Sequence, residues 1–154
     1  MAETAIASLT SEFGCFSIEA TETHITAVHW SDATRGAPTP LLIEALSQMQ
    51  AYFSGTLHRF DVPLAPNGTA FEKQVYAAIS AIPHGQTRTY GDLSRSLAAN
   101  PQAVGQACGS NPIPIIIPCH RVTAANGLGG FSSPAGVEQK VALLRHEGAY
   151  SLLL

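Results

Sequence analysis

The chain has 154 residues, of which 45% are hydrophobic and 12% are charged. This size and composition suit one globular domain, or one domain with a small N-terminal companion, and they argue against a disordered chain. The net charge of −3 provides no overall positive field to attract nucleic acid, so it disfavours a tight nucleic-acid binder but leaves room for a local patch.

Other bulk features narrow the class of protein further. No apolar run approaches the roughly 18 residues of a membrane span, and the first residues, MAETAIASLTSEF, do not resemble a signal peptide. The three cysteines, Cys15, Cys108 and Cys119, are widely spaced and follow no zinc-binding pattern. We therefore expect a cytoplasmic protein with free thiols, no membrane contact and no metal.

The first part of the chain predicts a small domain of strands and one helix. Residues 12–31 contain two β-rich runs around EATET, which predicts a hairpin. Thr39 and Pro40 are typical of a helix start, and apolar residues follow at helical spacing. The proline-containing segment 56–68 has the character of a connection, so we expect an N-terminal α/β domain of residues 1–66.

Residues 67–154 predict a mostly helical second domain, so the fold class is α+β. Capping boxes at Thr69 and Thr89 start two helices, and a third helix starts at Asn100; the second and third form a helix-turn-helix outline. A short apolar strand, IPIIIP (113–118), and a glycine-rich loop, NGLGGFSSPAG, follow. The final helix is expected to bury Val137, Val141 and Leu144.

The stretch IPIIIPCHRV places Cys119 and His120 side by side at the end of this strand. A lone cysteine after an apolar strand is commonly a small buried hydrophobe, but a nearby histidine can also make a thiol reactive, so both interpretations stand. Adjacent side chains point in different directions, which makes a direct hydrogen bond awkward, and a bridging water could relay the proton instead. Glu147, at a helix C-terminus that disfavours negative charge, is a candidate for orienting His120.

The helix-turn-helix outline is weak support for DNA binding, because many helical pairs of this kind bind nothing. Its second helix, PQAVGQACG, has no charged residue and many small ones. Small side chains allow the close approach either of a neighbouring helix or of a DNA groove, so both interpretations stay open.

Four stretches together resemble a known family: FEKQVYAAISAIPHGQTRTYGDL, AVGQACGSNPIPIIIPCHRV, GGFSSPAG and LLRHEG. They make residues from about 70 to 149 similar to the catalytic domain of the O6-alkylguanine-DNA alkyltransferases, also called methylated-DNA–protein-cysteine methyltransferases; the front half is similar more loosely. The resemblance implies a DNA repair protein that transfers the alkyl group of O6-alkylguanine, and of O4-alkylthymine, irreversibly to its own cysteine, once and without a cofactor.

The resemblance also implies roles for individual residues. Cys119 falls on the acceptor cysteine, His120 on the histidine that takes its proton through a water, and Glu147 on the carboxylate that orients this histidine. Asn111 falls on the asparagine that ties the helix-turn-helix to the active-site strand. Tyr90 falls on the tyrosine beside the extruded nucleotide, where it assists protonation of the departing guanine.

Further residues complete the implied base pocket and DNA surface. The pocket would be lined by Val122, Phe131 and Ser132. The DNA contacts would come from Tyr90, Arg88, Arg95, Gln102 and Ala103. The implied partner is double-stranded DNA, bound through its minor groove with the damaged base flipped out of the stack. No obligate protein partner is implied, and we expect a monomer.

The sequence departs from the family pattern in three places. Gln102 stands where the family has an arginine that fills the gap left by the flipped base. Arg88 and Arg95 are the only lysine or arginine residues between 84 and 112, so we expect weak DNA binding with a shallow salt dependence. Phe131 replaces the usual tyrosine, and the zinc ligands of some front domains are absent.

Two other functions are compatible with parts of this pattern. A non-catalytic module could bind alkylguanine in DNA and recruit other repair factors, but relatives of that type replace the acceptor cysteine, and Cys119 is present. A cysteine hydrolase built on Cys119 and His120 would need a direct contact between thiol and base, which their adjacency disfavours.

Overall fold

A computed structural model of the chain describes residues 4–131 and 136–149. The chain divides into two compact units, residues 1–67 and residues 68–154. No helix in the described ranges is long and apolar enough to cross a membrane.

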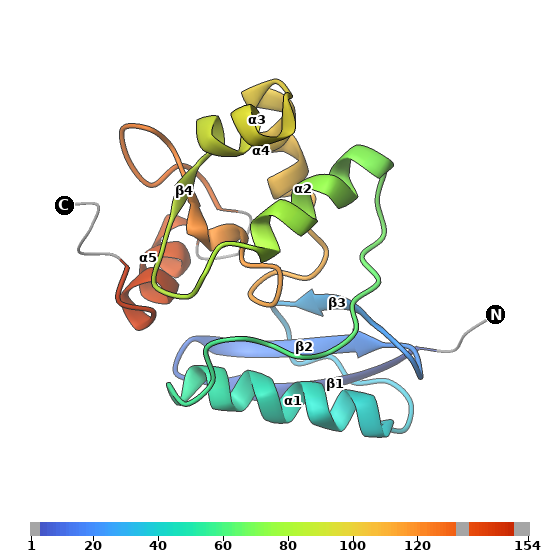
Figure 1. Cartoon of the computed structure of the whole chain (residues 1–154). Helices are drawn as coiled ribbons and strands as arrows, with labels where there is room; N and C mark the ends of the chain where they lie inside the picture. Colours follow the sequence, from blue (N-terminus) through green and yellow to red (C-terminus); the bar gives the residue numbers. More distant parts are fainter. Residues whose placement is uncertain (1–3, 132–135, 150–154) are drawn as a thin grey trace. The chain divides into compact units, whose positions relative to one another are not determined.

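The first unit contains, in its described part, a three-stranded antiparallel sheet and one helix. The strands are β1 (Ala5–Ser11), β2 (Gly14–Ala20) and β3 (Ile25–His29), in this order across the sheet (Figure 1). The helix α1 (Pro40–Phe53) packs against β1 and β2, and the Thr39 side chain caps its N-terminus as predicted. The predicted hairpin corresponds to β2 and β3, whereas β1 has no β-rich run that could have predicted it.

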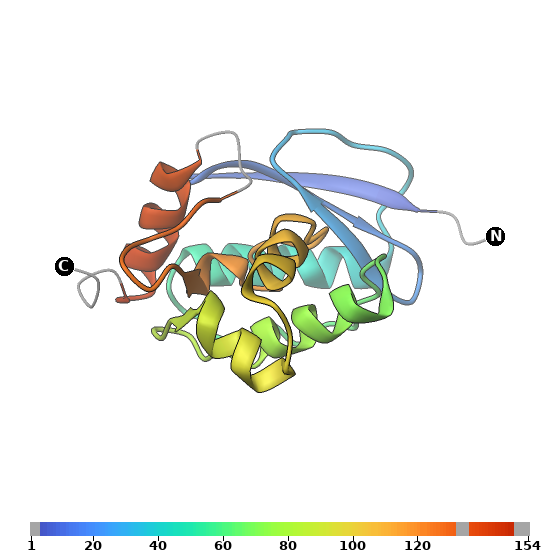
Figure 2. The same cartoon turned by 90° about the horizontal axis from the view of Figure 1, so that it is seen from above.

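The second unit is mostly helical and carries a small parallel sheet. Its described helices of at least eight residues are α2 (Ala70–Ser80), α3 (Tyr90–Leu97), α4 (Pro101–Gly109) and α5 (Val137–His146). The helix α4 packs against both α2 and α3 (Figure 2). The strand β4 (Arg88–Thr89) pairs in parallel with β5 (Val122–Thr123). The pairing joins the segment just before α3 to a segment more than thirty residues later, close to Cys119.

The local sequence explains where these helices begin. At the start of α2, the Thr69 hydroxyl accepts a hydrogen bond from the Glu72 amide, and the Glu72 carboxylate accepts one from the Thr69 amide. Thr89 and Asp92 form the same reciprocal pair before α3. The side chain of Asn100 caps α4. These predicted helix starts are confirmed, and α3 and α4 form the predicted pair of short helices.

The helix α5 lies where it was predicted, but its buried face differs in part from the predicted one. Val137 is 43% exposed, whereas Lys140, Leu143 and Leu144 are buried. The prediction is therefore wrong for Val137, whereas Leu144 is buried as predicted and Val141 is half-buried. A hydrophobicity pattern assigns core positions only to apolar side chains. It therefore cannot predict that a lysine such as Lys140 is buried with its ammonium group hydrogen-bonded.

Residues 113–118, IPIIIP, do not form the predicted strand. They form a buried turn in which the Ile117 amide donates to the Ile113 carbonyl at 2.9 Å, and Ile115 has a left-handed φ of 74°. The strand prediction is wrong because the two prolines lack amide donors, so this run cannot pair along a sheet ladder. The short strand of this region is β5, which follows the turn.

Candidate active site

A tight turn fixes the backbone of Cys119. Pro118 has a φ of −82° and a ψ of 67°, and the Cys119 amide donates to the Ile117 carbonyl at 2.8 Å, which is an inverse γ-turn. The Asn111 side chain closes the same turn: its Nδ2 donates to the Ile117 carbonyl at 2.8 Å, and its Oδ1 accepts from the Ile113 amide at 2.9 Å. Asn111 therefore links the segment after α4 to the segment before Cys119.

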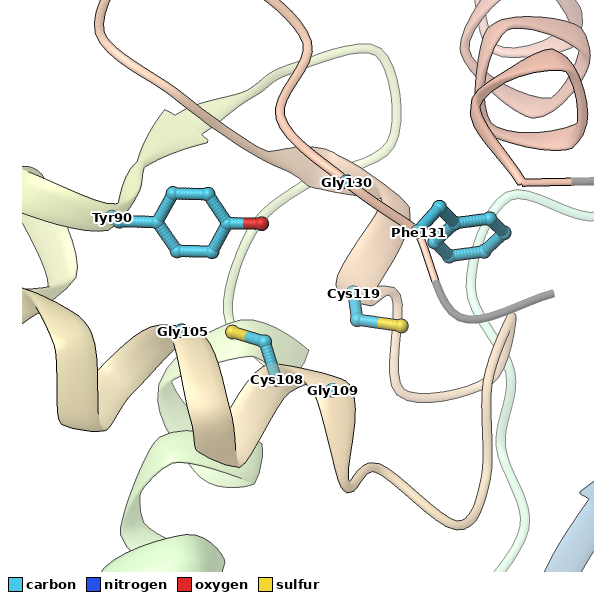
Figure 3. A pocket seen from close by; sticks show the side chains of 7 residues that line it. All are labelled: Tyr90, Gly105, Cys108, Gly109, Cys119, Gly130 and Phe131. Carbon is cyan, nitrogen blue, oxygen red and sulfur yellow. The ribbon is translucent and has the colours of Figure 1, made fainter.

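Cys119 begins a short 3₁₀ turn, η1 (Cys119–Arg121), and its half-buried side chain lines a cavity of about 230 Å³. Among the described residues, the cavity is lined by Tyr90, Gly105, Cys108, Gly109, Cys119, Gly130 and Phe131. Figure 3 shows these side chains coming from α3, α4, η1 and the glycine-rich loop. The volume is below the roughly 300 Å³ at which pockets for drug-sized ligands begin, so it suits a small group.

His120, Arg121 and Glu147 form a buried network beside Cys119. His120 Nε2 lies 2.7 Å from Glu147 Oε2, and Arg121 Nε and Nη2 donate to the two carboxylate oxygens at 2.8 and 3.0 Å. Arg121 Nη1 also donates to the Ile82 carbonyl at 2.7 Å. Since Glu147 caps the C-terminus of α5, the end of that helix positions the carboxylate.

The protonation of this network follows from its burial and charges. Burial alone would raise the pKa of Glu147, but the charges and hydrogen bonds of His120 and Arg121 hold that pKa well below its ordinary range. Burial lowers the pKa of His120, although Glu147 opposes the shift, so the imidazole is neutral at pH 7. An anionic Glu147 requires His120 to carry its proton on Nε2. Within the described residues, His120 Nδ1 has no hydrogen-bond partner, which leaves this nitrogen as a proton acceptor.

Two thiols line the cavity, and burial keeps both protonated. Burial raises the pKa of Cys119, while a hydrogen bond from Asn111 and the charge of Lys140 act in the opposite direction. Burial raises the pKa of Cys108 to about 12. A thiolate must therefore be generated within the site, and neutral His120, next to Cys119, is the base that the site offers.

Tyr90 contributes a protonated hydroxyl to the cavity. Burial raises the pKa of Tyr90 to about 12, so the phenol stays protonated at neutral pH and can donate a hydrogen bond. Gly129, with a φ of 73°, lies against the ring: a Cβ at this position would be 3.1 Å from Tyr90 Cε2 and 3.3 Å from the hydroxyl oxygen. The Tyr90 ring can therefore occupy this position only because residue 129 has no side chain.

The residues predicted to contact DNA lie on or beside α3 and α4. Gln102, which is exposed, and Ala103 belong to the first turn of α4. Arg88 is half-buried and hydrogen-bonded to the residues just before it. Arg95 is exposed and pairs with Asp92 at 2.6 Å. Both arginines of this surface are therefore already hydrogen-bonded or paired within the protein.

The predicted pocket residues are placed differently from one another. Phe131 lines the cavity. Val122 is fully buried and is not among the lining residues, and its carbonyl accepts a hydrogen bond from Lys140. Ser132 lies outside the described residues. In the described ranges, no group of three or more His, Cys, Asp or Glu side chains could hold a metal ion.

Three residues of the site were missed by reasoning from the sequence: Cys108, Arg121 and Lys140. Arg121 directly follows His120 in a chain with only 8 lysines and arginines, and that rarity is a signal that could have found it. Cys108 is hidden among the small residues of α4. Nothing in the sequence distinguishes Lys140 from an ordinary exposed helical lysine.

A cysteine that lines a small cavity, with a buried histidine–carboxylate pair beside it, defines a protein that uses a thiol as a nucleophile. Residues 70–149 match the family model described as 6-O-methylguanine DNA methyltransferase, DNA binding domain. The methylated-DNA–protein-cysteine methyltransferase of Methanosarcina acetivorans is 51% identical over 110 residues, which are 69% of each chain. The protein of that name from Mycobacterium tuberculosis H37Rv is 46% identical over 106 residues, 67% of this chain and 63% of that one. The chain belongs to the 6-O-methylguanine DNA methyltransferase family, which confirms the resemblance seen in the sequence.

Solved structures support the same assignment. The crystal structure of the Mycobacterium tuberculosis O6-methylguanine methyltransferase matches with a TM-score of 0.84 and 34% identity, and the match covers 96% of this chain and 94% of that one. The structure of the same organism's protein in complex with DNA matches with a TM-score of 0.83 and 35% identity over 94% and 93% of the two chains. The α+β fold class predicted from the sequence is confirmed.

Proposed function

We propose that this protein repairs alkylated DNA by moving the alkyl group of O6-alkylguanine onto Cys119, once per molecule. Transfer of an alkyl group to a protein cysteine is the activity of the family. The assignment to Cys119 rests on one observation: this thiol lines the cavity, and the buried pair of His120 and Glu147 lies directly beside it.

The substrate is double-stranded DNA, and the damaged base enters the cavity by leaving the base stack. A base inside a duplex is out of reach of a thiol that lies within a cavity, so it has to be flipped out. Gly105 and Gly109 of α4 line the cavity, and α4 has no charged side chain. These small residues support insertion of α4 into the minor groove, where a close backbone approach is needed.

The transfer begins with removal of the thiol proton. The proton passes from Cys119, through a water, to Nδ1 of His120, which becomes an imidazolium next to the Glu147 carboxylate. Arg121 holds that carboxylate ionised and in place. The thiolate then attacks the alkyl carbon: a carbon–sulfur bond forms, the bond from that carbon to O6 breaks, and its electron pair stays on the guanine.

The departing guanine needs a proton to become the normal base. The Tyr90 hydroxyl passes its proton to the guanine, and the His120 imidazolium returns the thiol proton to Tyr90 through water, so that His120 is neutral again. The products are an unmodified guanine in DNA and an S-alkylcysteine at residue 119. No step breaks the new thioether, so each molecule acts once; every proton and electron pair is provided by protein, water and substrate.

Intact-mass measurement after mixing the protein with duplex DNA containing O6-methylguanine tests the proposal. We expect one methyl group per protein, mapped to Cys119, and none on Cys119→Ser. Cys108→Ser is the matched control, because Cys108 lines the same cavity and this variant should still take up the methyl group. Tight binding without a mass change would instead support a binding module, and many cycles of substrate turnover would support a hydrolase.

A further inference from the structure

Lys140 has its side chain fully buried in the second unit, which is rare for a lysine. Burying an ammonium group is costly unless its protons are hydrogen-bonded. Lys140 Nζ donates to the Val122 carbonyl at 2.6 Å and to the Gly130 carbonyl at 3.0 Å. Its acceptors here are two backbone carbonyls, so its positive charge is not neutralised by them.

These two carbonyls belong to two different walls of the cavity. Val122 follows η1 directly and therefore continues the backbone that carries Cys119. Gly130 lines the cavity from the glycine-rich loop. One ammonium group on α5 thus connects the thiol-bearing segment to the loop, and it lies 6.0 Å from the centroid of the Tyr90 ring. That arrangement fixes the distance between the walls.

The titratable groups around Lys140 come from each neighbouring element: Tyr90 on α3, Cys108 on α4, and Cys119 and His120 on η1. Burial lowers the pKa of Lys140 to about 8, while Cys119 and Cys108 oppose the shift. Lys140 is therefore still charged at pH 7. In return, its charge acts to lower the pKa of Cys119, against the effect of burial.

We propose that Lys140 is a positioning residue of the transfer reaction, whose buried ammonium holds the two cavity walls together and stabilises the Cys119 thiolate as it forms. The role of Lys140 in alkyl transfer rests on the proposed function. The effect of its charge on the ionisation of Cys119 does not depend on DNA and can be measured without it.

The test therefore uses a small electrophile, iodoacetamide, and measures the labelling rate of Cys119 by peptide mass spectrometry as a function of pH. In Lys140→Met we expect Cys119 to react about tenfold more slowly at pH 7, since one pKa unit is a tenfold change in thiolate fraction. Lys140→Arg, which keeps the charge, should restore most of the rate. Cys15, which is exposed in the first unit, serves as an internal control whose rate should not change.

A purely structural role for Lys140 predicts a different result, in which Lys140→Met and Lys140→Arg slow the labelling equally at every pH. That outcome, or an unchanged rate in a folded Lys140→Met, overturns the inference.

The wild-type protein provides a second test that needs no variant. Lys73 and Lys140 are its only lysines, so ¹³C-lysine NMR can follow Lys140 with exposed Lys73 as reference.

In wild-type protein the labelling rate of Cys119 should rise less steeply with pH once the NMR signal of Lys140 titrates. A single smooth titration of Cys119 across that pH would overturn the inference. A protein that fails to take methyl groups from DNA, yet shows this coupling, would refute the proposed function and leave the role of Lys140 intact.

Discussion

Gly129→Ala should damage the site through the Tyr90 ring, although Gly129 itself is not among the residues that line the cavity. Gly129 has a φ of 73°, where an L side chain costs about 1–2 kcal/mol. The new Cβ would also lie 3.1 Å from Tyr90 Cε2, closer than ordinary van der Waals contact, so the ring must move by a few tenths of an ångström.

Two magnitudes follow from these distances. The free energy of unfolding should fall by about 1–2 kcal/mol from the backbone term. The rate of alkyl transfer should fall by about tenfold, because a displacement of about 1 Å can cost a hundredfold and this one is smaller. Urea unfolding measures the first, and single-turnover methyl transfer from an O6-methylguanine duplex measures the second.

Gly127→Ala is the matched control in the same loop. A Cβ at residue 127 meets nothing within 4 Å, and Gly127 does not have the left-handed φ of Gly129. This variant should keep both its stability and its transfer rate. If Gly129→Ala and Gly127→Ala behave alike in both assays, the placement of Tyr90 against residue 129 is wrong.

Other predictions concern the buried network and the DNA surface. Glu147→Gln should cost about 3–5 kcal/mol of stability in urea unfolding, since it leaves Arg121 as a buried charge without its partner; it should also slow transfer about a hundredfold or more, and a wild-type rate would contradict the relay. Because burial lowers the pKa of His120 below 6.5, the unfolded chain binds a proton there before the native one, so stability should fall as pH drops below about 6.5. His120→Asn should flatten this loss between pH 6.5 and 5, and an unaltered slope would remove His120 as its cause. Gln102→Arg should tighten DNA binding and steepen its dependence on salt by about one phosphate contact; if both stay flat, residue 102 does not contact DNA.

The sequence predicted best what depends on local patterns. The starts of α2 and α3 follow from Thr69 with Glu72 and from Thr89 with Asp92, because a capping box involves only four neighbouring residues. The family follows from long matching stretches. Neither depends on how distant segments pack.

The failures have two causes, one within a single segment and one in contacts between distant segments. IPIIIP has the composition of a strand, but its prolines lack amide donors, and hydrogen bonds within the segment and to the nearby Asn111 side chain hold it in a turn. Lys140 looks like a surface lysine because its acceptors, the carbonyls of Val122 and Gly130, are backbone atoms that carry no sequence signal. Arg121 was missed for a related reason: its partner Glu147 lies 26 residues away in the chain.

The turn at IPIIIP bears on whether the motif PCHR could be moved into another protein. Ile115 is a β-branched residue at a φ of 74°, a conformation that costs about 1–3 kcal/mol, and it is held there by burial, with 1% of its surface exposed. A short peptide with this sequence would therefore relax to an extended chain. Grafting only the four residues PCHR onto a new scaffold would therefore not reproduce their conformation. A graft also has to include Asn111 and the surrounding residues that bury the isoleucines.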